Sequence, residues 1–80
     1  MSEPLRAWLV AAVAGYLALP PSRVGTGVKL RSIGLDSLHA MGLCVDIEES
    51  WGVLVEPTLA WDFPTIDAIA AHLEGQVDRT

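Results

Sequence analysis

Apolar residues recur at helical spacing in three stretches of the chain, so the pattern predicts three main helices. The intervals of three and four residues first appear over about residues 4–17, and they return over about 37–51 and 65–75. This spacing places apolar side chains on one face of an α-helix. A shorter stretch, about 58–62, has room for one or two helical turns only. The pattern therefore predicts an all-α protein, a bundle of three to four helices.

Residues that cap or break helices mark the predicted ends. Pro20 and Pro21 stop the first helix, because proline lacks the amide hydrogen and disfavours helix in the residue before it. Gly52 and Gly75 each follow a helical stretch, at the position where glycine adopts the left-handed conformation that ends a helix. Thr65 is a good N-cap for the last helix.

A long connection, residues 18–36, separates the first two predicted helices. Connections of this length in compact domains tend to be functional or to be held down by their own side chains. The apolar residues available as anchors are Val24, Val28, Leu30 and Ile33. We therefore expect a loop that packs across the helices.

The stretch Gly34-Leu35-Asp36-Ser37-Leu38 lies where this loop becomes the second helix. Either Asp36 or Ser37 can cap the free amide groups of that helix. A serine at this point has a presented hydroxyl, and the positive end of the helix suits an added phosphate group.

Ser37 lacks the neighbours that a catalytic serine requires. A serine nucleophile needs a base and an oxyanion hole, and hydrolases present it on a sharp turn after a strand. His39 is two residues further on, a spacing that points it around the helix away from Ser37. The sequence therefore predicts a serine that is modified by another enzyme, in a protein that is not itself an enzyme.

Composition limits the chain to a single domain over residues 1–80, because so short a chain can close only one small core. Half of the residues, 51%, are hydrophobic, which excludes a disordered tail. One cysteine and two histidines are too few for a disulfide or a structural zinc site, so no metal is expected. No apolar run reaches the ~20 residues of a membrane span, and the N-terminus lacks a signal peptide, so we expect a cytoplasmic protein without a membrane partner.

Charge is distributed unevenly around a net value of −5. From Asp36 onward there are nine acidic residues and one basic residue. An acidic half repels nucleic acid and favours basic protein surfaces. The alternative is a solvated acidic surface that only maintains solubility.

Taken together, these motifs resemble an acyl carrier protein of the polyketide synthase type, which depends on 4'-phosphopantetheine. The resemblance runs from the first helix through Leu73, and it rests on residues 34–38, Ile47-Glu48 and Trp61-Asp62-Phe63-Pro64-Thr65-Ile66. It implies an acyl-carrier-like bundle with a long loop between helices 1 and 2. The same resemblance, with Met1 and short flanks, leads us to expect a discrete protein that acts as a monomer.

The resemblance also implies roles for individual residues. A phosphopantetheinyl transferase would attach 4'-phosphopantetheine to Ser37 with the help of Asp36, and acyl groups would be carried as thioesters on the terminal thiol. Partner enzymes would read the helix face formed by Leu38, Met41, Val45, Glu48 and Glu49. The implied partners are an acyl-loading enzyme, either an acyltransferase or an acyl ligase, and a ketosynthase or other biosynthetic enzymes.

Several alternatives stay open at this point. The cargo can be a starter unit, an aminoacyl unit or a fatty-acid chain instead of a polyketide intermediate. An alternative from a different functional class is a helical protein-interaction module whose serine is never modified. Met41 and Val45 can be core residues or an exposed edge. Cys44 fits a small core residue better than the lining of an acyl cavity, and core packing is favoured for Trp61 over contact with the prosthetic arm. Because Gly42 and His39 leave the start of the second helix short of negative charge, we expect partners to dock through apolar contacts near Met41 and Val45.

Overall fold

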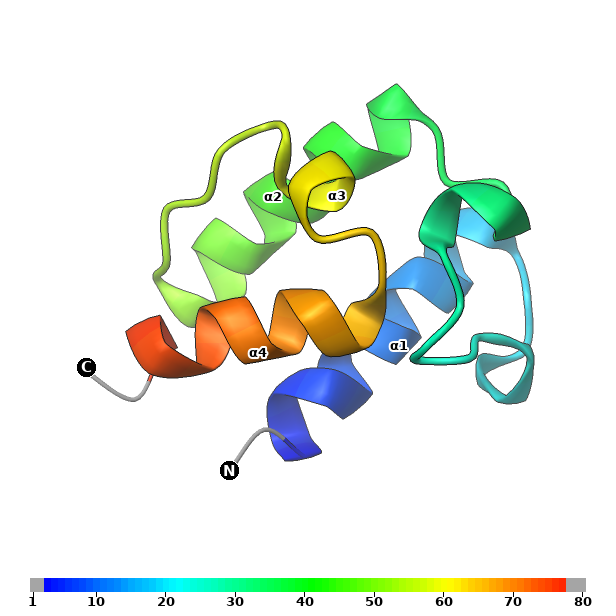
Figure 1. Cartoon of the computed structure of the whole chain (residues 1–80), viewed down its shortest axis with the longest axis horizontal. Coiled ribbons are helices and arrows are strands. Elements are labelled where there is room, and N and C mark those ends of the chain that lie inside the picture. Colours follow the sequence, from blue (N-terminus) through cyan, green and yellow to red (C-terminus); the bar gives the residue numbers. More distant parts are fainter. Residues whose placement is uncertain (1–2, 78–80) are drawn as a thin grey trace.

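The computed structural model describes residues 3–77, and the fold of this part of the chain is entirely helical (Figure 1). The elements are α1 (Glu3–Leu17), α2 (Ser37–Trp51), α3 (Leu59–Asp62) and α4 (Ile66–Val77), with 3₁₀ turns at Pro21–Arg23 and Leu30–Ile33. The expected all-α class is confirmed. Within the described range, no helix is both long enough and apolar enough to cross a membrane.

The core is formed by apolar side chains from all of the helices and from the long loop. α1 packs against α4 and α2, and the single turn of α3 packs against α2. The most deeply buried side chains are Leu9, Val13, Leu30, Leu43, Ile47, Ile66, Ile69 and Leu73. Burial of each such side chain contributes roughly 1.5–3 kcal/mol. With neither disulfide nor metal cluster among the described residues, this apolar packing is what stabilises the bundle.

The end of α1 is built by a left-handed residue that is not glycine. Ala18 has φ +55°, and the amide of Leu19 donates to the carbonyl of Ala14 at 3.0 Å, the six-to-one bond of a Schellman motif. An alanine in this conformation costs roughly 1–2 kcal/mol. Pro20 follows at once, so the chain leaves the helix where the proline pair predicted that it would.

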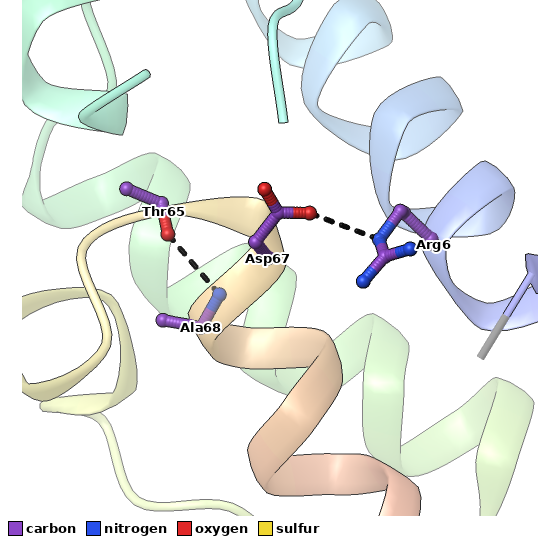
Figure 2. A network of polar contacts seen from close by, with 4 residues as sticks. All are labelled: Arg6, Thr65, Asp67 and Ala68. Atoms are coloured by element: carbon purple, nitrogen blue, oxygen red, sulfur yellow. Dashed lines mark hydrogen bonds and ion pairs between the residues drawn. The ribbon is translucent and has the colours of Figure 1, made fainter. Parts of the chain in front are cut away.

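Thr65 caps α4 as predicted, since its hydroxyl oxygen accepts from the amide of Ala68 at 3.1 Å (Figure 2). In the same region, Asp67 in the first turn of α4 reaches across to α1, where its carboxylate lies 3.0 Å from Nε of Arg6. The predicted end of this helix at Gly75 is wrong, because α4 continues to Val77. A glycine inside a helix costs only about 1 kcal/mol relative to alanine, which the burial of the helix on the core outweighs.

The long loop is fastened by two backbone hydrogen bonds, one to the turn between α3 and α4 and one to the first turn of α4. The amide of Leu30 donates to the carbonyl of Pro64, and the amide of Asp67 donates to the carbonyl of Thr26, both at 2.9 Å. Leu30 is fully buried, but Val28 is 42% exposed, so the prediction that Val28 anchors the loop is wrong. Val28 lies in a tight turn in which its amide bonds to Gly25, and this turn directs its side chain outward.

Three aromatic residues join α1 to α2 at the margin of the core. Trp8 and Trp51 meet edge to face, with ring centres 6.2 Å apart and planes at 86°, a favoured arrangement for aromatic pairs. Trp8 and Tyr16 are half-buried and pack against the core instead of lying inside it.

Candidate functional site

The loop enters α2 through a turn that only glycine adopts readily. Gly34 ends the 3₁₀ turn at Leu30–Ile33 with φ +108°, in the left-handed region where a side chain is strained. Leu35 then returns to the core at 3% exposure, and its amide donates to the carbonyl of Leu30 at 3.1 Å. The chain is therefore fixed directly before the point where α2 begins.

Asp36 is the N-cap of α2. Its carboxylate oxygen Oδ1 accepts from the backbone amide of His39 at 2.8 Å and lies 3.2 Å from the ring atom Nδ1 of the same histidine. The sequence left the cap open between Asp36 and Ser37, and the hydrogen bond assigns it to Asp36. Because the cap is provided by its neighbour, the hydroxyl of Ser37 is free.

Ser37 is the first residue of α2, and it is exposed. It borders a cavity of about 580 Å³ lined by Arg31, Leu35, Asp36, Ser37 and Trp61. The presented hydroxyl predicted from the sequence is thus confirmed. The amide groups of the first turn of α2 give this end of the helix a partial positive charge, which favours a phosphate group beside it.

Trp61 lies in this cavity wall and not in the core, so the expectation of core packing is wrong. It is 39% exposed, whereas Leu59 and Ala60 in the same turn of helix are buried. The guanidinium of Arg31 lies over the indole ring, 5.2 Å from its centre. The sequence carries no signal for this pairing, because the two residues are 30 positions apart.

An exposed stripe runs along α2 from Ser37 toward its C-terminal half. Its apolar members are Leu38, Met41 and Val45, which are 76%, 55% and 51% exposed. Two exposed carboxylates, Glu48 and Glu49, continue it. We refer to these five residues as the α2 face. The structure therefore decides the open question about Met41 and Val45, both of which belong to the exposed edge of the helix.

Asp46, the remaining acidic residue of this helix, is turned away from the α2 face. Its carboxylate accepts a hydrogen bond from the hydroxyl of Tyr16 on α1. Burial raises the pKa of Tyr16 above its ordinary value, and the bond to Asp46 raises it further. The ring of Tyr16 also stacks on His39 at 5.9 Å between centres, so this contact supports α2 close to Asp36 and Ser37.

Cys44 is 8% exposed, as expected for a small core residue, yet it also lines a cavity of about 180 Å³ together with Met41, Val45 and Glu48 of the α2 face. Its thiol donates to the carbonyl of Glu56 at 3.3 Å, and burial raises its pKa. A thiol with a raised pKa is a poor nucleophile at neutral pH. Within residues 3–77 there is also no group of three or more metal-ligating side chains.

Comparison with known proteins agrees with this geometry. Residues 7–73 match the family model described as "Phosphopantetheine attachment site". A free-standing peptidyl carrier protein of Acinetobacter baumannii is 35% identical in sequence and superposes with a TM-score of 0.86 over 90% of both chains. The acyl carrier protein LipD of Actinoplanes friuliensis is 39% identical, with a TM-score of 0.78 over 100% of this chain and 89% of its own.

Among curated proteins, the erythronolide synthase EryA3 of Saccharopolyspora erythraea is 33% identical over 69 residues. That match covers 86% of this chain but only 2% of the length of the synthase. The similarity is therefore to one small domain of a much larger protein. The chain belongs to the phosphopantetheine attachment family, whose members are non-catalytic carrier proteins with a covalently attached 4'-phosphopantetheine.

Proposed function

We propose that Ser37 is the attachment site of 4'-phosphopantetheine and that the chain carries acyl intermediates in polyketide biosynthesis. The observation that carries this proposal is the exposed Ser37 hydroxyl at the start of α2, beside a cavity of about 580 Å³. The site fits the group, since its wall offers a cation, an indole ring and the positive end of a helix.

In the proposed modification, a phosphopantetheinyl transferase joins Ser37 to the phosphopantetheine half of coenzyme A. The Ser37 oxygen forms a bond to phosphorus and loses its proton, and adenosine 3',5'-bisphosphate leaves. Asp36 assists by holding the first turn of α2 in place and by presenting a carboxylate to the transferase and its metal. The attached group supplies a flexible arm with a terminal thiol, which carries the acyl cargo as a thioester.

The polyketide assignment rests on similarity to synthase domains such as that of the erythronolide synthase. The partners we propose are an acyltransferase or acyl ligase, a ketosynthase and other biosynthetic enzymes, which dock on the α2 face of a monomeric carrier in the cytoplasm. A second candidate cargo is an aminoacyl group, because one of the similar structures is a peptidyl carrier protein. Incubation of the modified protein with candidate loading enzymes and acyl or aminoacyl donors separates these two cargoes by mass.

The proposal is tested by intact mass after incubation with coenzyme A, magnesium and a promiscuous phosphopantetheinyl transferase. We expect a gain of one phosphopantetheine that is absent from Ser37→Ala. The matched control is Ser50→Ala, which changes another exposed serine of α2 and should be modified like the unaltered protein. The new thiol can be distinguished from Cys44 because the buried cysteine should react slowly with alkylating reagents. Absence of a mass gain in folded, previously unmodified protein would refute the proposal.

A further inference from the structure

The cavity beside Ser37 contains a guanidinium that forms no ion pair with any described residue. Of its lining residues, Arg31 alone is cationic. Within the described part of the chain, Arg31 forms no ion pair, and its one recorded partner is the ring of Trp61. The distance of 5.2 Å from the guanidinium carbon to the ring centre is within the ~6 Å range of a cation–π interaction.

This arrangement leaves the hydrogen-bonding capacity of Arg31 available. No hydrogen bond or ion pair of this guanidinium occurs among the described residues, so its N–H donors can bind another group. A planar fork of donors matches two oxygens of a phosphate group. The ring also limits the side-chain freedom of Arg31, so less entropy is lost when a phosphate is bound.

The carboxylate of Asp36, the single acidic residue in the lining of this cavity, makes a cation there more important. Asp36 is next to Ser37 in sequence, and a phosphodiester on Ser37 would add a negative charge beside its carboxylate. One oxygen of Asp36 is already engaged by the amide of His39, but its charge remains. Arg31 is the described group in this cavity that can offset the combined negative charge.

We propose that Arg31 and Trp61 form a seat for the proximal part of the phosphopantetheine arm. Arg31 donates to the phosphodiester on Ser37, and the exposed indole of Trp61 packs against the two methyl groups of the pantoyl unit. This inference rests on the proposed attachment at Ser37 and adds to it two positioning residues, from the loop and from α3. The arm is thereby held against the cavity wall between encounters with partner enzymes.

The test compares the apo and modified forms of the full chain by NMR. The indole N–H signal of Trp61, assigned from its loss in Trp61→Phe, should shift on modification more than those of Trp8 and Trp51. In Arg31→Gln most of this shift should be lost, and the phosphorus signal of the single phosphodiester should move toward that of a free phosphopantetheine ester. Raising sodium chloride to about 1 M, where the Debye length is about 3 Å, should likewise reduce the shift.

Arg23→Gln is the matched control, since it removes one exposed cation of the same loop that does not line the cavity. It should leave both signals as in the unaltered protein. A mass gain with an unmoved Trp61 signal, or an equal response of Arg31→Gln and Arg23→Gln, would overturn the seat while leaving attachment at Ser37 intact. Absence of a mass gain in the folded protein would overturn both proposals. Arg31→Lys, which keeps the charge without the planar fork, should retain part of the shift.

Discussion

Replacement of the cap of α2 tests whether local geometry at Asp36 supports both stability and modification. Asp36→Ala removes the bond between its carboxylate and the amide of His39, which is 2.8 Å long. Loss of an N-cap costs typically about 1 kcal/mol, within a range of 0.5–2. The Asp36 side chain is 63% exposed, so water can partly replace the lost acceptor and the middle of that range applies.

The comparison variant is Asp36→Asn, because asparagine caps about as well as aspartate but lacks the charge. Loss of the interaction between charge and helix dipole costs about 0.3 kcal/mol at an exposed site. In urea, followed by circular dichroism, the unfolding midpoint should therefore fall by roughly 0.5–1 M in the alanine variant. It should fall by a few tenths of that in the asparagine variant. Equal losses of stability in the two variants would refute the reasoning, because the charge of Asp36, and not its hydrogen bond, would then be what stabilises the helix.

The same pair of variants separates two roles of Asp36 in modification. If the transferase needs the carboxylate, both variants should be modified slowly at a temperature where both are folded. If the transferase needs only an ordered first turn, Asp36→Asn should be modified at the normal rate and Asp36→Ala should be slow. The initial rate of mass gain measures this difference.

Three further predictions concern the rest of the chain. Gly42→Ala should stabilise the protein by about 0.5–1 kcal/mol in urea denaturation, because Gly42 lies inside a helix and an added methyl group would meet no neighbouring atom. Gly52→Ala should destabilise it, because Gly52 has φ +69°, which strains any residue with a side chain. Stability should fall as pH rises past roughly 10, because the unfolded chain then loses the Tyr16 proton while the folded protein, in which the pKa of Tyr16 is raised, keeps it. Tyr16→Phe should flatten this loss in urea midpoints measured across pH. In assays of acyl transfer from a loading enzyme, Met41→Ala and Val45→Ala should slow the reaction more than charge reversal of the two glutamates of the α2 face, and the opposite order would refute apolar docking.

Local signals made the site at the start of α2 predictable. Gly34, Asp36 and Ser37 act through turn geometry, capping and exposure, and each of these depends on the nearest few residues. The cap of α4 at Thr65 was predictable for the same reason. Sequence reasoning is reliable where the physical cause lies within one turn of helix.

Other features depend on contacts between distant segments, and these were not predictable. Trp61 lies in a single turn of helix, where no periodicity indicates which side faces the core. Its pairing with Arg31 and the hydrogen bond of Tyr16 to Asp46 each join residues 30 positions apart. Likewise, both edges of α2 are apolar, so only tertiary packing shows that Met41 and Val45 stay exposed.

The two backbone bonds that join the long loop to the start of α4 and to the turn before it have a consequence for the construction of chimeric carriers. Leu30 and Thr26 are joined to Pro64 and Asp67 by main-chain atoms, so the fit depends on the backbone path of both segments. Exchanging the loop alone with that of another carrier would therefore misplace the serine relative to the bundle. Grafts that transfer residues 18–36 together with residues 61–67 should keep the recipient's serine in register and carry the donor's cavity wall intact.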